Sequence, residues 1–159
     1  PIVLSDELAD RWVLTEFSAE GPNLLDVAVS TTPDPVPPAT WHVYSFQAPG
    51  FPDYPKYGLW SNSLSVTTNE SGPGVLHSYF INRAELMAGA NMVTMQRIGL
   101  PGQTGTEQGF IVATPVTWEG ENKPVEDRPI IVTLNDASWN AGQAEDEILM
   151  FTLDIDWEN

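Results

Sequence analysis

Two adjoining segments decide the fold: Asp53–Trp60, which reads DYPKYGLW, and Ser61–Glu70, which reads SNSLSVTTNE. A proline fixes its own φ and biases the residue before it toward an extended backbone. Pro55 therefore predicts an extended Tyr54 and a rigid turn that leads into a strand. The β-rich run after Trp60 predicts a further strand. These segments indicate an architecture, but they contain no constellation of residues that names a reaction.

Short runs with the period of strands continue on the N-terminal side of these segments. Three of them lie at Arg11–Ser18, Asn23–Thr31 and Thr40–Ala48. Gly, Pro, Asn or Asp bounds each run, and 14 prolines and 12 glycines punctuate the chain, which is the signature of strands and turns. Successive strands joined by short turns pair as neighbours, so these three are predicted to lie side by side in one sheet. Their placement in different sheets would favour a sandwich.

All the runs together form three groups, at about residues 1–50, 51–100 and 101–159. A spacing of about fifty residues lies within the range of propeller blades. The sequence therefore predicts an all-β fold of antiparallel four-stranded meanders, about three blades of a β-propeller, in a single region that spans residues 1–159. One segment departs from this pattern. Asn82 as N-cap, the helix formers of Arg83–Ala88 and a terminating Gly89 predict one short helix.

Composition excludes several classes of protein. Twenty-two acidic and six basic residues give a net charge of −16, which argues against nucleic acid and anionic membrane surfaces as partners. No stretch approaches the roughly 20 apolar residues that a membrane helix needs, so no membrane insertion is expected. The chain has no cysteine, which excludes disulfides and thiolate chemistry and is compatible with any compartment.

The candidate ligand-binding residues are Asp53, Lys56 and Trp60. Lys56 is one of two lysines in a strongly acidic chain. One interpretation is an ion pair between Lys56 and Asp53 or another carboxylate, which would lock the loop. The other places Lys56 and Trp60 near a propeller mouth, where a cation and an aromatic ring could hold a polar ligand such as a glycan.

Carboxylates supply the candidate metal ligands. Asp154 and Asp156 are two positions apart and would share one face of a strand, where they could bind Ca²⁺, a cation that takes oxygen ligands. No other cofactor is expected. Carboxylate pairs of this kind could also perform glycosidase chemistry, but many pairs meet by chance in so acidic a chain. No catalytic residue is assigned, and His42 and His77 lack the spacing of a zinc site.

Several motifs resemble those of a large family of secreted bacterial proteins. They are Pro1–Leu4, Leu8–Phe17, Val27–Pro35, Phe51–Trp60, Val66–Glu70, Arg83–Gly89 and Asp154–Trp157. The members look like multi-bladed β-propellers, and Bacteroidota often export them through the type IX system. One departure is at Gly58–Asn62, which reads GLWSN where the family usually reads GVWPD. The further blades that usually follow this region are also missing.

The resemblance implies a secreted or cell-surface structural or binding module with no catalytic chemistry of its own. Three blades leave two faces uncovered, and residues such as Val27, Val29, Ile131 and Leu149 are expected on them. The expected partners are therefore further blades, from another polypeptide or from a continuation of the same one. The alternative is part of a carbohydrate-active propeller enzyme that hydrolyses or binds a glycan, with its site completed outside this chain.

Overall fold

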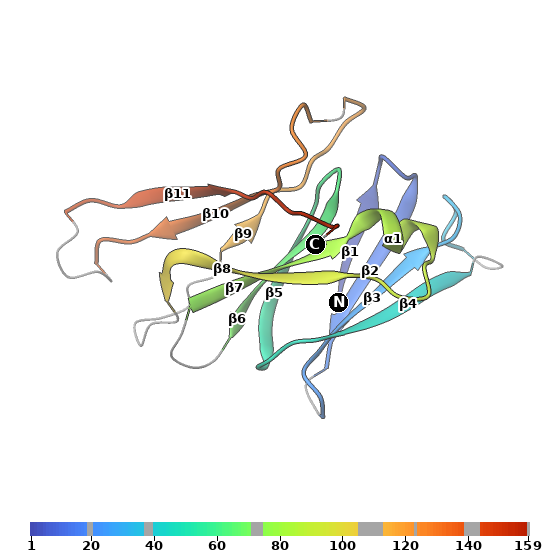
Figure 1. The fold of residues 1–159 in the computed structure, drawn as a ribbon, viewed down its shortest axis with the longest axis horizontal. Coiled ribbons are helices and arrows are strands. Elements are labelled where there is room, and N and C mark those ends of the chain that lie inside the picture. Colours follow the sequence, from blue (N-terminus) through green and yellow to red (C-terminus); the bar gives the residue numbers. More distant parts are fainter. Residues whose placement is uncertain are drawn as a thin grey trace.

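The computed structural model contains three antiparallel sheets, of four, four and three strands, and one short helix (Figure 1). The predicted all-β fold of blade-like meanders is confirmed. The residues that the structure describes are 1–18, 21–36, 40–70, 75–104, 113–122, 124–138 and 144–158.

The first sheet is a simple meander. Its strands are β1 (Ile2–Asp6), β2 (Arg11–Phe17), β3 (Leu24–Ser30) and β4 (Trp41–Gln47), each hydrogen-bonded to the one before it. The three N-terminal runs that the sequence predicted to be neighbours are β2, β3 and β4, so that prediction is confirmed.

The second sheet repeats this order. Its strands are β5 (Pro52–Leu59), β6 (Ser63–Glu70), β7 (Val75–Asn82) and β8 (Met95–Thr104). The predicted short helix is α1 (Arg83–Ala88), which connects β7 to β8.

Both predicted caps of α1 are present. The Asn82 side chain accepts the Glu85 N–H at 3.2 Å, and Gly89 ends the helix at φ 65°. Only glycine adopts that φ without strain, and a Cβ at Gly89 would also overlap the His42 ring. No helix in the described part of the chain is long and apolar enough to cross a membrane.

The third sheet contains β9 (Thr114–Pro115), β10 (Ile130–Asn135) and β11 (Glu147–Thr152), in the order β11-β10-β9. Its first strand lies against the second sheet. Trp118 donates its backbone N–H to the Leu59 carbonyl at 2.8 Å, and Thr67 donates its hydroxyl to the Ala113 carbonyl. Gly58 permits this approach, because a Cβ there would lie 2.7 Å from the Pro115 Cβ.

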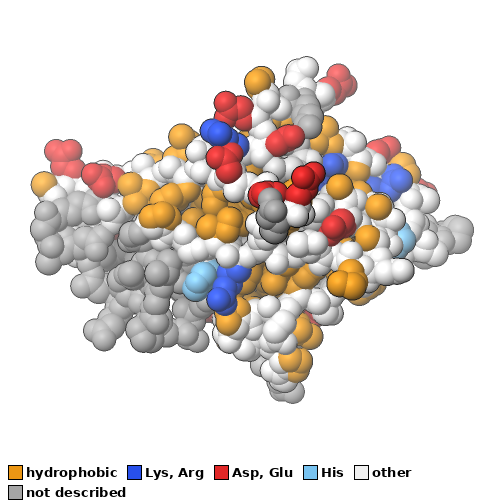
Figure 2. Space-filling model, viewed as in Figure 1, with side chains coloured by type: hydrophobic (Ala, Val, Ile, Leu, Met, Phe, Trp, Pro, Cys, Tyr) orange, Lys and Arg blue, Asp and Glu red, His pale blue; other side chains and the backbone are white. Residues whose placement is uncertain are grey.

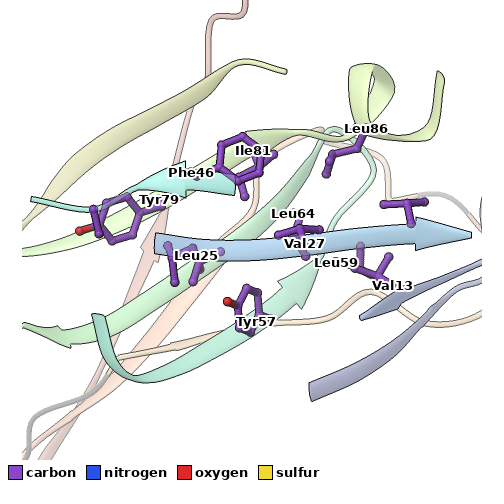
Figure 3. Packing of buried hydrophobic residues seen from close by; sticks show 13 residues of the cluster. Val13, Leu25, Val27, Phe46, Tyr57, Leu59, Leu64, Tyr79, Ile81 and Leu86 are labelled. Carbon is purple, nitrogen blue, oxygen red and sulfur yellow. The ribbon is translucent and has the colours of Figure 1, made fainter. Parts of the chain in front are cut away.

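The second sheet is the middle layer of the molecule. Side chains alternate between the two faces of a strand, and β7 uses both faces. Tyr79 and Ile81 pack in a core shared with the first sheet (Figure 3). Phe80 packs in a second core, with Leu100 and with Ile131 of the third sheet. The three sheets therefore form one stack.

The stack corrects the predicted exposure of its sheet faces. Val27 and Val29 are 1% exposed and Ile131 is 0% exposed, because these three residues face the second sheet. Leu149 is half-buried. Both faces of β3 and β10 carry apolar residues, so sequence alternation alone could not identify the inward face. Shifting a strand by one residue turns every one of its side chains to the opposite face of the sheet.

A buried ion pair connects the first sheet to the second. Asp6 at the end of β1 binds Arg83 at the start of α1 through two parallel contacts of 2.6 Å, to Nε and Nη2. Asp6 also accepts the Ala9 N–H at 3.0 Å, and Arg83 donates to the Ser61 carbonyl at 3.4 Å. Removing one partner of such a pair leaves a buried charge without compensation, which is strongly destabilising.

We expect Asp6→Asn to lower the free energy of unfolding by about 3 kcal/mol, because it leaves the largely buried Arg83 charge without its partner. Asp154→Asn is the matched control, since its partnership with Arg128 lies at the surface and is worth at most about 1 kcal/mol. Urea unfolding of both variants measures the difference. Equal losses in the two variants would show that the Asp6 pair does not hold the sheets together.

Candidate functional site

A β-bulge opens β5 at the segment that the sequence singled out. Asp53 pairs with Asn69 and Lys56 pairs with Thr67, so two residues, Tyr54 and Pro55, oppose one on β6. Such a bulge interrupts the ladder and redirects the side chains of the bulged strand.

The predicted extended backbone at Tyr54 is wrong. Its φ is 49°, in the left-handed region that bulky side chains rarely occupy. The extra residue of the bulge accounts for this conformation, because it must be accommodated between two positions that β6 holds in register. Conformations of this kind persist only where the surroundings enforce them, and they often mark functional sites.

The bulge brings Tyr54 and Lys56 together. The Lys56 Nζ lies 3.4 Å from the centroid of the Tyr54 ring, and Tyr54 as a residue is 49% exposed. An ammonium over an aromatic face is a cation–π interaction. Asp53 and Lys56 are both among the described residues, and they form no ion pair with each other. The Tyr54 ring is therefore the partner that the structure gives to the Lys56 ammonium.

A pocket of about 330 Å³ lies beside this pair, where the bulge faces β1 and β2. Its walls are mainly apolar and aromatic, and Ile2, Phe17, Tyr54, Pro55 and Tyr57 contribute to them. The charged side chains that line it are Glu16, Asp53 and Lys56. An apolar pocket with a few polar groups at its edge is the usual form of a small-ligand site.

Two side chains of the pocket have shifted pKa values. The Phe17 N–H, at 3.1 Å, and the Pro1 amino group, at 3.3 Å, hold the pKa of Glu16 below its usual value. Burial raises the pKa of Tyr57, although the nearby Thr15 hydroxyl opposes the shift. Glu16 therefore remains ionised at neutral pH, whereas a general acid needs a raised pKa.

Trp60 is separated from the other two candidate residues. It follows the far end of β5, where its side chain is buried and donates Nε1–H to the Glu126 carbonyl at 3.3 Å. Sequence reasoning missed Tyr54 as the aromatic member of the site. The signal was available, because residues two apart on a strand share a face and Tyr54 is two positions from Lys56.

The candidate metal ligands do not lie on a strand. Asp154 and Asp156 follow the end of β11, so the prediction that they share a strand face is wrong. Asp154 binds Arg128 Nε at 2.7 Å, and Asp156 accepts the Glu158 N–H at 2.9 Å. Within the described ranges, no three His, Asp or Glu side chains are grouped so that they could hold a metal ion.

The outer face of the first sheet carries a continuous apolar row. Val3 pairs with Leu14, Leu14 with Ala28, and Ala28 with Val43. The row crosses all four strands, and Val43 is 69% exposed.

The outer face of the third sheet has a similar strip. Val132 pairs with Met150 and Leu134 with Ile148. Ile148 is 80% exposed and Met150 is 65% exposed. Figure 2 shows hydrophobic side chains gathered over β10 and β11. We call these two surfaces the end faces, because they lie at opposite ends of the stack of sheets.

Comparison with protein-family models, with curated proteins and with solved structures found no match to this chain.

The buried Tyr57 predicts a loss of stability in alkali. Because the folded pKa of Tyr57 is raised above its ordinary value of 10.0, stability is complete below about pH 10 and falls as the pH rises further. We expect wild type to lose about 1 kcal/mol more than Tyr57→Phe between about pH 8 and about pH 11. Urea unfolding at the two pH values measures this, with Tyr54→Phe as the control at a half-exposed ring. Equal losses in wild type and Tyr57→Phe would contradict the assignment.

Proposed function

We propose that this region is a secreted or cell-surface structural and binding module without catalytic chemistry of its own. Its end faces pack against further four-stranded sheets, from another polypeptide or from a continuation of the same one. The apolar row across the first sheet carries the proposal. The sequence resemblance to secreted β-propeller proteins supports the secreted location and the kind of partner.

The end faces are built like the interfaces inside the stack. On β2, Val13 points into the core and the adjacent Leu14 points outward. On β10, Ile131 points inward and Leu134 outward. Strands with apolar residues on both sides are typical of sheets that are covered on both sides. Contiguous exposed apolar patches mark interaction surfaces.

A pocket beside Tyr54 and Lys56 favours a second candidate function, the binding of a polar ligand such as a glycan. An exposed aromatic ring and an adjacent ammonium offer one apolar and one polar contact. Glu16 and Asp53 also line the pocket, but the lowered pKa of Glu16 does not suit a general acid. Binding is therefore favoured over hydrolysis.

The end faces predict self-association when charge repulsion is screened. At a net charge of −16, copies repel one another at low ionic strength, and about 1 M salt shortens the range of that repulsion to about 3 Å. We expect sedimentation velocity to show monomers at about 0.05 M salt and larger species at about 1 M. Val43→Asp and Met150→Asp should suppress the larger species, because each places a charge on an end face.

Val36→Asp and Val125→Asp are the matched controls, since both valines are exposed and lie outside the end faces. They should associate as wild type does. A compact monomer at every salt concentration would overturn the packing proposal.

The second candidate function is tested with a panel of soluble glucans and xylans. Tyr54→Ala should weaken binding of a recognised glycan by about tenfold, a typical value for the loss of one aromatic contact. Binding that survives Glu16→Gln and Asp53→Asn would support a binding site. Turnover that either carboxylate change abolishes would support the enzyme instead.

A further inference from the structure

Among the described residues, the third sheet has one strand fewer than each of the first two sheets. The first sheet ends at β4 and the second at β8, and each of these strands pairs with the third strand of its own meander. In the third sheet, the corresponding position lies beside β11. Among the residues that the structure describes, no strand pairs with the outer edge of β11.

The segment that follows β11 turns away from this position. Leu153 donates its N–H to the Pro129 carbonyl at 3.1 Å, on the β10 side of the sheet. Leu153 is buried in the second core, and Ile155 and Trp157 pack against that core. The Asp156 carbonyl accepts a hydrogen bond from Gln96 of β8. The described residues that follow β11 thus lie on the second sheet and not beside the outer edge of β11.

The edge of β11 lacks the usual protection. Natural edge strands carry lysine, proline or a bulge that prevents pairing with another chain. The sequence of β11 is EILMFT, and it pairs with β10 over six residues without a register shift. Such a regular, largely apolar edge is a template for the addition of an extended strand.

The charges around the edge indicate what kind of strand would pair there. Glu145, Asp146 and Glu147 lie at the N-terminal end of β11, whereas Asp154, beyond the other end, already binds Arg128. An antiparallel strand with basic residues on its C-terminal flank would complement the acidic end. A second copy of this chain fits poorly, because each copy carries a net charge of −16.

We infer that β11 receives, antiparallel, an extended apolar segment with Lys or Arg on its C-terminal flank, supplied by a different polypeptide, as the fourth strand of the third sheet. The inference deepens the proposed function and rests on it. The end faces bind through side chains, whereas this edge binds through backbone hydrogen bonds. A side-chain substitution on an end face should therefore leave strand binding at the edge intact, and backbone methylation of the bound strand should leave the end faces intact.

The probe is the synthetic peptide KKVTVIVTKK, acetylated and amidated, and binding to the whole chain is measured by fluorescence anisotropy. Two further versions carry N-methyl groups on the amides of one edge or of the other. Only one edge of the peptide can pair with β11, so one version should bind about tenfold more weakly and the other about as well as the parent. The peptide EEVTVIVTEE should also bind about tenfold more weakly than the parent at low salt.

Hydrogen exchange of the β11 amides locates the contact. Alternate amides of a strand point to opposite edges, so the peptide should protect every second amide of Glu147–Thr152 and leave the others unchanged. Undetectable binding, equal binding of the two N-methylated versions, or protection elsewhere would overturn the inference. Protection of the outward amides before the peptide is added would also overturn it, because another segment would then occupy the edge.

The variant Val43→Asp separates this inference from the proposed function. It should suppress association in high salt and leave peptide binding and β11 protection intact, because Val43 lies on the first sheet. If wild type fails to bind the peptide but still associates in high salt, the strand inference fails and the packing proposal stands.

Discussion

The whole arrangement depends on the burial of both faces of the second sheet. Ile81 on one face of β7 and Phe80 on the other are 0% exposed, so the first and third sheets must each cover one side. Each outer sheet is then left with one covered and one open face. The two end faces are consequences of this layering. Hydrophobic burial, which is non-directional and roughly proportional to area, supplies the driving force.

Much of the architecture could be predicted because its signals are local. The strand runs of β2, β3 and β4 and the caps at Asn82 and Gly89 are set by patterns a few residues long, and all were predicted. The inward faces could not be predicted, since Val27 and Ala28 are both apolar and only the packing of the second sheet distinguishes them. The Asp6–Arg83 pair joins residues 77 positions apart, and nothing local to either residue indicates the other.

The candidate site shows the same division. Lys56 was identified by its rarity in an acidic chain, and the structure places it beside a pocket. Its aromatic partner was missed because a turn was expected at Tyr54 and Pro55, where the structure has a bulged part of strand β5. Pro55 favours an extended backbone at Tyr54, but the register that β6 imposes on both sides of the bulge overrides this local preference. The cost of a positive φ at a tyrosine is of order 1–3 kcal/mol, so the surrounding sheet must offset it.

Apolar faces alone do not determine how two sheets align, because they tolerate sliding. Inside the stack, directional contacts fix the alignment. Asp6 and Arg83 join the first sheet to the second, and Gly58 lets the third approach so closely that Trp118 reaches the Leu59 carbonyl. The described residues of the end faces contain no buried ion pair of this kind. Specificity for a partner must therefore come from groups around those faces, and in a chain of net charge −16 these are mostly carboxylates. Charge complementarity governs the choice of partner more than the strength of binding, so the acidic surface that keeps copies of this chain apart also selects a basic partner.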